Sequence, residues 1–373
     1  MLIWLPMQRI PPALAPMLCV PGLLYESLVR ARNGLYNTGL LPRRYLPGPV
    51  LSVGNITLGG TGKTPLVLYI AQVLIQNGFQ PAILTRGYRR TQPNKTRILA
   101  PNEGVPSAAR ILGDEPAVMR RHLSSAWMGI SKNRFRAGSL ISKKLRHAIF
   151  ILDDGFQHRR LYRDLDIVIL DRSQALQSNR VFPRGTLREP LSGLHRCHAI
   201  VLNGARDEDT GDPFIEEIAC RHPEASIFFC SQTIVSLVHL AAWDAMDFSV
   251  EAPRPHSAYL VAALGNPQRF AQDVQRLGIE VRGAKFFPDH YWPAPTDWKA
   301  CAEDARSKHA EAIITTEKDA VKILQSPDFP VMVSQQSTRM SNAHAFEAML
   351  LRHVERRLGG RQISGREKTE KSG

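Results

Sequence analysis

The sequence predicts an α/β protein with a parallel sheet in its first domain and a smaller α/β domain after it. Two patterns carry this prediction. Apolar runs of strand length alternate with longer segments of helical periodicity, and a glycine-rich turn stands between the first such strand and the first helix. A second, shorter series begins near Pro253, and 373 residues are enough for two domains.

The first domain is predicted from five strand-like runs. The first run is followed by residues 64–78, which have helical spacing and end at Asn77-Gly78. The runs are almost wholly apolar, as expected of parallel strands that helices cover on both faces. Ligands in such sheets bind at the carboxyl ends of the strands, where the polar residues of this chain gather. The five runs cover residues 50–55, 81–87, 147–155, 165–171 and 198–204.

The second domain is predicted from a shorter set of the same elements. Residues 259–267 and 281–287 are strand-like, and a helical segment separates them. Another strand and its loop fall at 311–320. The expected divisions are an apolar and basic membrane-interface segment at residues 1–34, the first domain at 35–225, a linker with strand-like pieces at 226–252, the second domain at 253–354 and a disordered basic tail at 355–373.

Composition excludes several classes of protein. The chain has 48 basic and 34 acidic residues and a net charge of +14, which favours anionic lipids or phosphorylated small molecules as partners. Neither an aromatic-rich RNA-binding signature nor a helix-turn-helix pattern occurs, so we expect no nucleic-acid partner, and no obligate protein partner is indicated. The five cysteines are scattered without a Cys-x-x-Cys pair, which argues against a zinc knuckle and favours a reduced, cytosolic setting.

The N-terminal segment is apolar without resembling a membrane span. Prolines interrupt residues 1–22 and Arg9 adds a charge, so the roughly 20 continuous apolar residues of a span are absent. From Leu23 onward, apolar residues fall on one side of a predicted helix, with Arg30 and Arg32 on the other. Such a helix either lies on an anionic lipid surface or packs on the protein's own sheet.

The glycine-rich turn TLGGTGKTPL at residues 57–66 predicts a nucleotide site. A phosphate-binding loop needs glycines so that backbone N–H groups converge on phosphate, a lysine for the β- and γ-phosphates, and a hydroxyl for Mg²⁺. ParA-like ATPases share the short GGxGKT form, but they carry a signature lysine where this chain has Leu58. The first domain is therefore predicted to be P-loop NTPase-like, with nucleotide contacts at Gly59, Gly60, Thr61, Gly62, Lys63 and Thr64.

Two adjacent carboxylates, Asp153 and Asp154, end the strand-like run IFILDDG. A carboxylate at this place in a P-loop site holds Mg²⁺ directly or through water. One aspartate at the end of a strand is often only a cap, but two in succession fit that explanation poorly. The polar side chains that follow suit a sugar or a phosphate, and they are Gln157, His158, Arg159 and Arg160.

Three further charged groups are ambiguous when each is taken alone. Ordinary turn and capping roles explain all of them. They are Asp114-Glu115 at the start of a predicted helix, the isolated Asp289-His290, and Thr316 to Asp319 at a strand-to-helix turn.

Taken together and in order, these motifs resemble the tetraacyldisaccharide 4′-kinase family, the kinases of lipid A biosynthesis. DDGFQHRR and GGTGKTP are the most specific of them. The resemblance covers about residues 20–325 and includes GNITLGGTGKTP, TRGY, GDEP, DDGFQHRRLYRDLDIVILD, LREP, GNPQRF, DH and TEKDAVK. One departure is Tyr291, because the family often has a second histidine there.

The resemblance implies a two-domain kinase on the cytoplasmic face of a bacterial inner membrane, held there as a peripheral or monotopic protein. It would transfer the γ-phosphate of ATP to the 4′-hydroxyl of tetraacyldisaccharide 1-phosphate and so produce lipid IVA. The acylated disaccharide phosphate and the lipid surface would then be its partners, and Mg²⁺ would act beside ATP.

The resemblance also implies roles for single residues. Asp114 and His290 would form the catalytic pair that deprotonates the sugar hydroxyl, and Lys63 would act on the phosphates. The residues implied around the metal are Thr64, Asp153, Asp154 and Glu115. Those implied near the lipid head group are Gln157, His158, Arg188 and Glu189. Because His290 lies in the second domain and Asp114 in the first, we expect the pair to form only when the cleft between the domains is closed.

Three other interpretations explain less of the sequence. A soluble P-loop kinase of a small phosphorylated sugar leaves the apolar N-terminus unexplained. A ParA-like switch that transfers nothing conflicts with Leu58 and with a candidate base on the second domain. A non-catalytic membrane-binding protein with a decayed nucleotide site conflicts with the intact Lys63, Thr64 and paired aspartates.

Overall fold

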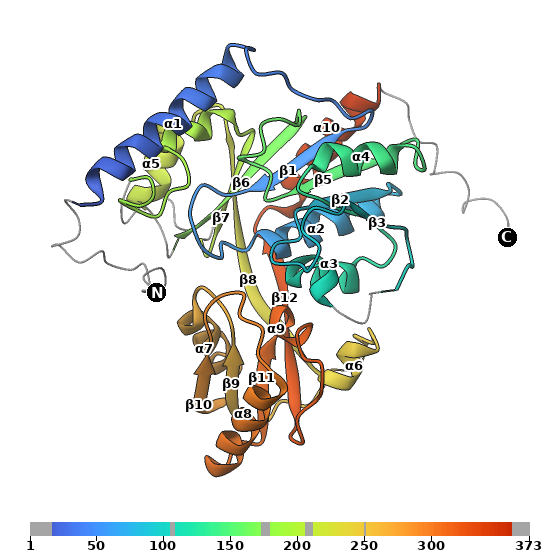
Figure 1. The fold of residues 1–373 in the computed structure, drawn as a ribbon, viewed down its shortest axis with the longest axis vertical. Coiled ribbons are helices and arrows are strands. Elements are labelled where there is room, and N and C mark those ends of the chain that lie inside the picture. The colour runs from blue at the N-terminus through green and yellow to red at the C-terminus, as the bar shows by residue number, and fades with distance from the viewer. Residues whose placement is uncertain (1–16, 105–108, 173–179, 206–211, 250, 360–373) are drawn as a thin grey trace, which may run out of the picture.

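The computed structural model describes residues 17–104, 109–172, 180–205, 212–249 and 251–359. Within these residues the chain forms two α/β units that share one twelve-stranded sheet (Figure 1). The strand order is β10-β9-β11-β12-β8-β7-β6-β1-β5-β2-β4-β3. Residues 1–16 of the predicted N-terminal segment and 360–373 of the predicted tail lie outside the described part.

The first unit contains all five strands that the sequence predicts, and they run parallel to their neighbours within it. They are β1 (Val50–Gly54), β2 (Pro81–Thr85), β5 (Ile149–Asp153), β6 (Leu165–Asp171) and β7 (Ala199–Asn203). Two short strands were not predicted. β4 (Trp127–Ile130) pairs in parallel with β2, and β3 (Arg97–Leu99) adds an antiparallel edge.

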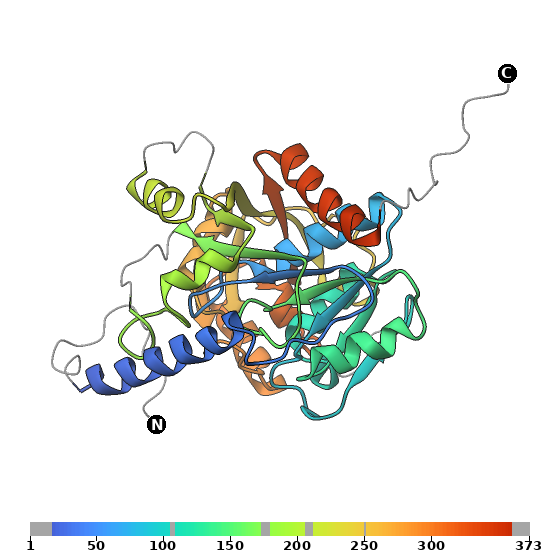
Figure 2. The same ribbon diagram turned by 90° about the horizontal axis from the view of Figure 1, so that it is seen from above.

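The side chains of these strands alternate between apolar cores on the two faces of the sheet. Leu51 and Val53 of β1 enter one core, whereas Val50 enters the core on the other face. Seen from above, α10 and α4 lie on opposite sides of the strands (Figure 2). The covering helices are α2 (Lys63–Gln76), α3 (Asp114–His122) and α10 (Ala343–Leu358) on the first face, and α4 (Arg134–Ser142) and α5 (Pro213–Arg221) on the second.

The second unit is a smaller parallel arrangement with its own cores. Trp298 packs on one side of its strands and Phe270 on the other. Its strands are β9 (Ser257–Ala262), β10 (Glu280–Phe286) and β11 (Ala312–Thr316). Its helices are α6 (Leu240–Asp244), α7 (Pro267–Gln275), α8 (Pro295–Ser307) and the short α9 (Glu317–Ala320).

Two long antiparallel strands join the units. β8 (Ser226–His239) pairs with β7 through its first residues and with β12 (Val331–Met340) beyond them. β12 in turn pairs with β11 at its beginning. The stretch expected as a linker at 226–252 is thus largely a strand that runs from one unit into the other, as Figure 1 shows.

The end of the chain differs from the expected division. Helix α10 belongs in sequence to the predicted second domain, but Phe346, Leu350 and Val354 pack in the core of the first unit. The helix also continues to Leu358, so residues 355–358 are helical where a disordered tail was expected. The helix lies there because its apolar residues recur with helical spacing and cover the face of the sheet beside α2.

Helix α1 (Cys19–Asn37) lies against the first unit and contacts the loops that follow β5 and precede β7. Tyr25 Oη donates a hydrogen bond to the carbonyl oxygen of Arg188 at 3.1 Å. Arg32 Nη2 donates to the carbonyl oxygen of Gln157 at 2.9 Å. One side of the helix is therefore fixed to the protein.

The other side of α1 is apolar and exposed. Val20, Leu24 and Leu28 are 74%, 61% and 62% exposed, and they fall on one face because each lies four positions after the one before. The helix starts before the predicted Leu23, at Cys19. Among the described residues, no helix combines the length and the apolar character needed to cross a bilayer. Both interpretations of the segment thus have a structural basis, one on each side of the helix.

Candidate active site between the two units

The phosphate-binding loop connects β1 to α2. Its last glycine, Gly62, has a φ of 89°, in the left-handed region that glycine adopts without strain. A side chain there would also collide with Gln232, since an added Cβ would lie 1.9 Å from the Gln232 Oε1 atom. Helix α2 begins without a side-chain cap, so its first backbone N–H groups point into the loop, where an anion is stabilised.

Buried polar side chains fix the loop from behind. Asn55 Nδ2 donates to the carbonyl oxygen of Thr57 at 2.9 Å and to Thr61 Oγ1 at 3.1 Å. Gln232 Nε2, from β8, donates to the carbonyl oxygen of Gly62 at 2.7 Å. The six predicted nucleotide contacts therefore lie together on a loop whose shape depends on residues outside it, and sequence reasoning missed Asn55 and Gln232.

Asp153 is buried at the end of β5. Thr85 Oγ1, at the end of β2, donates a hydrogen bond to it at 2.8 Å. Burial, followed by the nearby charges of Glu115 and Asp154, raises the pKa of Asp153 to about 7. Crowded carboxylates of this kind are stabilised by a cation.

Asp154 follows directly and has cationic partners. Arg188 Nη1 lies 2.9 and 3.0 Å from its two carboxylate oxygens, and Lys63 Nζ lies 3.7 Å from Oδ1. Burial alone would raise the pKa of Asp154, but the charges of Lys63 and Arg188 outweigh it and lower the pKa. Arg188, expected near the lipid head group, is therefore paired with a carboxylate expected near the metal.

These residues fit a magnesium ion that is bound mainly by phosphate and water. Among the described residues, no three His, Cys, Asp or Glu side chains converge to form a metal cage. Mg²⁺ in a nucleotide site needs only one or two carboxylates, because phosphates and water supply the other ligands. Thr64 and Glu115 line the same cavity, and the charge of Glu115 helps to raise the pKa of Asp153. This donor set suits Mg²⁺ with bound nucleotide, whereas Asp154 already has two cations beside it.

Asp114 and His290 meet across the two units. Asp114 begins α3 of the first unit, His290 follows β10 of the second, and His290 Nδ1 lies 2.8 Å from Asp114 Oδ2. Burial would raise the pKa of Asp114, but the hydrogen bond to His290 and the charge of Lys318 hold it well below its usual range. A carboxylate at Nδ1 favours the tautomer with its proton there, which leaves Nε2 as a base.

Lys318 lies beside this pair, at the start of α9. Its Nζ is 2.9 Å from Asp289 Oδ1 and 3.4 Å from His290 Nε2. It is also 4.0 Å from both the Asp114 and the Glu115 carboxylates. Burial would lower the pKa of Lys318, but these three carboxylates raise it above its ordinary value. Sequence reasoning gave this residue no site role, although it stands in the quoted TEKDAVK motif.

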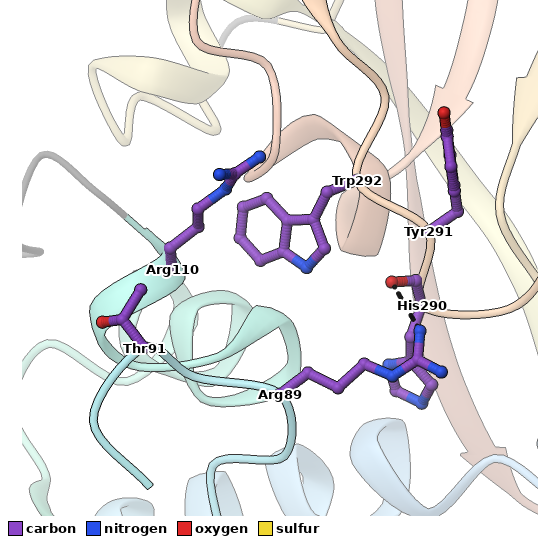
Figure 3. A pocket seen from close by; sticks show the side chains of 6 residues that line it. All are labelled: Arg89, Thr91, Arg110, His290, Tyr291 and Trp292. Carbon is purple, nitrogen blue, oxygen red and sulfur yellow. Dashed lines mark hydrogen bonds between the residues drawn. The ribbon is translucent and has the colours of Figure 1, made fainter.

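Two cavities adjoin these residues. One, of about 150 Å³, lies between the units and is lined by residues that include Thr64, Glu115, Leu264, Lys318 and Gln336. The other, of about 450 Å³, lies beside His290 and is lined by Arg89, Thr91, Arg110, His290, Tyr291 and Trp292 (Figure 3). Figure 3 shows Arg89 reaching from the first unit to the His290 carbonyl oxygen, at 3.2 Å.

Two of the predicted head-group residues are bonded to each other and to α1. Gln157 Nε2 donates to the carbonyl oxygen of Asn55 at 2.8 Å and to Glu189 Oε1 at 2.9 Å. Glu189 is buried and also accepts from Asn33 of α1 at 3.1 Å and from Arg196 at 2.9 Å. These contacts connect the phosphate-binding loop to α1.

His158 lies next to this set and carries no charge near neutral pH. Burial, with the neighbouring charges of Arg134 and Arg163, lowers its pKa to about 3. The structure thus places the four predicted head-group residues along one strip between the loop and α1.

The phosphate-binding loop, the carboxylates at the neighbouring strand end and the histidine–aspartate pair from opposite units define the class of the protein, which is an ATP-dependent P-loop kinase.

The chain belongs to the tetraacyldisaccharide 4′-kinase family, because the family model described as tetraacyldisaccharide-1-P 4′-kinase matches residues 14–355. It is 32% identical over 332 residues to the tetraacyldisaccharide 4′-kinase of Desulfotalea psychrophila, which covers 88% of this chain and 93% of that one. It is 35% identical to the enzyme of the same name from Aquifex aeolicus, over 80% of this chain and 87% of that one.

A solved structure agrees with these relatives. The crystal structure of an "apo" form of the kinase from Aquifex aeolicus in complex with ATP has a TM-score of 0.70 and 29% identity, and the match covers 92% of this chain and 98% of that one. The family, the α/β fold class with its P-loop domain and the ATP-dependent kinase activity predicted from the sequence are confirmed.

Proposed function

We propose that this chain transfers the γ-phosphate of ATP to the 4′-hydroxyl of tetraacyldisaccharide 1-phosphate and so forms lipid IVA. The observation that supports this most directly is the Asp114–His290 pair, which joins the two units at 2.8 Å beside the cleft that Thr64 lines. A general base is useful to a kinase whose acceptor is a sugar hydroxyl, because the hydroxyl is a poor nucleophile.

The residues divide the reaction between the two units. Asp114 holds the Nδ1–H of His290, and Nε2 takes the proton of the attacking hydroxyl. The N–H groups at the start of α2 and the Lys63 ammonium stabilise the charge of the phosphates. Mg²⁺, when bound, would add positive charge at the transferring phosphate, and Thr64, Asp153 and Glu115 are the residues proposed to surround it. Asp154 would stand beside them, paired with Lys63 and Arg188.

The cavity of about 150 Å³ between the units is proposed to hold the terminal phosphates of the nucleotide. Thr64 lines it from the first unit, and Leu264 and Gln336 line it from the second. Bound ATP would then contact both units and favour the closed cleft. Closure excludes water, which favours transfer over hydrolysis.

The acceptor is proposed to approach along the strip of head-group residues beside α1.

A second place for its charged groups is the larger cavity next to His290. This cavity is lined by Arg89 and Arg110, and the Arg110 guanidinium lies 5.1 Å from the centre of the Trp292 ring. Two arginines and an aromatic ring suit a phosphorylated sugar. These contacts support a negatively charged acceptor rather than a neutral one.

The membrane surface is proposed as the place of action, on the cytoplasmic face of a bacterial inner membrane. A tetraacylated substrate stays in the bilayer, so the enzyme must reach it there. The exposed face of α1 with Val20, Leu24 and Leu28, together with the net charge of +14, provides an apolar and an electrostatic attraction.

The membrane proposal is tested by the double variant Leu24→Gln/Leu28→Gln. We expect its affinity for anionic liposomes to fall more than tenfold, because each exposed leucine that enters the lipid interface contributes on the order of 1–2 kcal/mol. Flotation with phosphatidylglycerol liposomes measures the effect. Leu324→Gln is the matched control, since Leu324 is 60% exposed on the second unit. Equal flotation of all three proteins would contradict the role of α1.

The transfer itself is tested with γ-labelled Mg·ATP and tetraacyldisaccharide 1-phosphate in mixed micelles. We expect a labelled lipid with the wild type and none with Lys63→Ala. Label released only as free phosphate, under every detergent condition, would instead favour an ATPase switch.

A further inference from the structure

The motif TEKDAVK, residues 316–322, contains two lysines, and the proposed function uses neither. Lys322 is fully buried, with its Nζ 2.7 Å from Asp319 Oδ1. Asp319 Oδ2 also accepts from the Ala263 N–H at 2.9 Å and from Thr316 Oγ1 at 2.8 Å. Lys322 and Asp319 therefore hold α9 against β9 and β11.

Lys318 differs, because its ammonium lies in the cleft instead of in the core. It lines the cavity that Thr64 and Glu115 also line. Its closest carboxylate is Asp289 at 2.9 Å, and the contact with His290 Nε2 is longer, at 3.4 Å. The Asp289 contact anchors the lysine, whereas a hydroxyl arriving at His290 Nε2 can replace the weaker contact without releasing the anchor.

The position of Lys318 matches the place where negative charge must be held during transfer. The hydroxyl that His290 deprotonates has to lie within hydrogen-bond distance of Nε2, and it attacks a phosphoryl group that the α2 start and Lys63 hold on the opposite side. Lys318 Nζ stands beside Nε2 on the second unit and lines the same cavity as Thr64.

We infer that Lys318 is a catalytic residue that binds the transferring γ-phosphoryl group from the second unit, an inference that rests on the proposed function. In the step, the acceptor oxygen forms its bond to the γ-phosphorus and its proton goes to His290 Nε2. The bond between the γ-phosphorus and the bridging oxygen breaks, and its electron pair stays on ADP. Lys318 keeps its proton and neutralises charge on the γ-phosphoryl oxygens.

The experiment compares Lys318→Met and Lys318→Arg with Lys299→Met, an exposed lysine of α8 on the same unit. We expect Lys318→Met to lower kcat about a hundred- to a thousandfold, as for loss of one preorganised donor. Its KM for ATP should stay close to the wild type, whereas its Tm should fall, because Asp289 and Asp114 lose a cation. Lys318→Arg should restore part of kcat, and Lys299→Met should change nothing.

A second readout separates chemistry from structure. ADP with aluminium fluoride mimics the transferring group, so Lys318→Met should weaken binding of that complex with Mg²⁺ by at least tenfold more than it weakens binding of ATP. Equal losses for both ligands, or an unchanged kcat, would overturn the inference. A wild type that binds both ligands but makes no labelled lipid would instead refute the proposed acceptor, and the binding comparison would still decide the role of Lys318.

Discussion

The phosphate-binding loop and the Asp114–His290 pair are two halves of one site, but they are built in different ways. The loop is a contiguous stretch between β1 and α2, and its glycines can be recognised in the sequence. The pair joins residues that are 176 positions apart and belong to different units. We therefore expect the loop to hold a nucleotide in either state of the cleft, and the proposed base to be complete only when the cleft is closed.

The largest expected effect comes from removing the assembled half. His290→Ala should lower kcat about a hundred- to a thousandfold, because the hydroxyl loses its base, while ATP still binds to the intact loop. Steady-state transfer and titration with ATP measure the two quantities. His344→Ala, an exposed histidine of α10, is the matched control. Loss of ATP affinity in parallel with kcat would show that the two halves are not separable.

A smaller effect should show how far the loop depends on residues outside it. Gln232→Leu removes the 2.7 Å hydrogen bond to the Gly62 carbonyl oxygen, so we expect the KM for ATP to rise about tenfold, the equivalent of about 1.4 kcal/mol. Ser236→Ala is the control, because it removes a hydrogen bond of the same strand to Gln335 and leaves the loop untouched. A KM unchanged in Gln232→Leu would mean that the loop keeps its shape alone.

A third effect concerns the stability of the first unit and leaves its activity at neutral pH unchanged. The pKa of His158 is lowered to about 3 in the folded state, so between pH 6.5 and 3 the unfolded chain binds a proton that the folded chain does not. Folding stability from this group is complete above pH 6.5 and is lost as the pH falls. Between pH 7.5 and 5, the wild type should lose about 1–2 kcal/mol more stability than His158→Asn.

Urea unfolding at several pH values measures this difference, with His344→Asn as the exposed control. If the free energy of unfolding changed with pH in the same way in the wild type and in His158→Asn, the pKa of His158 would not be lowered by folding, which would contradict the prediction.

The same contrast explains what could be predicted from the sequence. GGTGKT and the aspartates at the end of an apolar run carry their meaning in short contiguous stretches, because a loop and a strand end are local structures. β4 was missed because WMGI is short and has a single β-branched residue. β12 was missed because its sequence turns polar where it enters the antiparallel pair with β8.

Contacts between distant elements were harder to predict. The family resemblance suggested that Asp114 and His290 act together, and the structure brings them within 2.8 Å. Lys318 gave no comparable signal, since a helix start explains charged residues locally and only the fold places its ammonium beside His290. Glu189 was assigned to the head group, but its burial against Asn33 depends on where α1 docks.

The place of α10 in the chain has a consequence for biosynthesis. The last described helix covers the core of the first unit, although the whole second unit is synthesised between them. An emerging chain therefore cannot complete the core of its nucleotide-binding half until α10 has left the ribosome. The first unit therefore cannot finish folding before the second unit is synthesised. A nascent chain that stops before Ala343 exposes the apolar face beside α2.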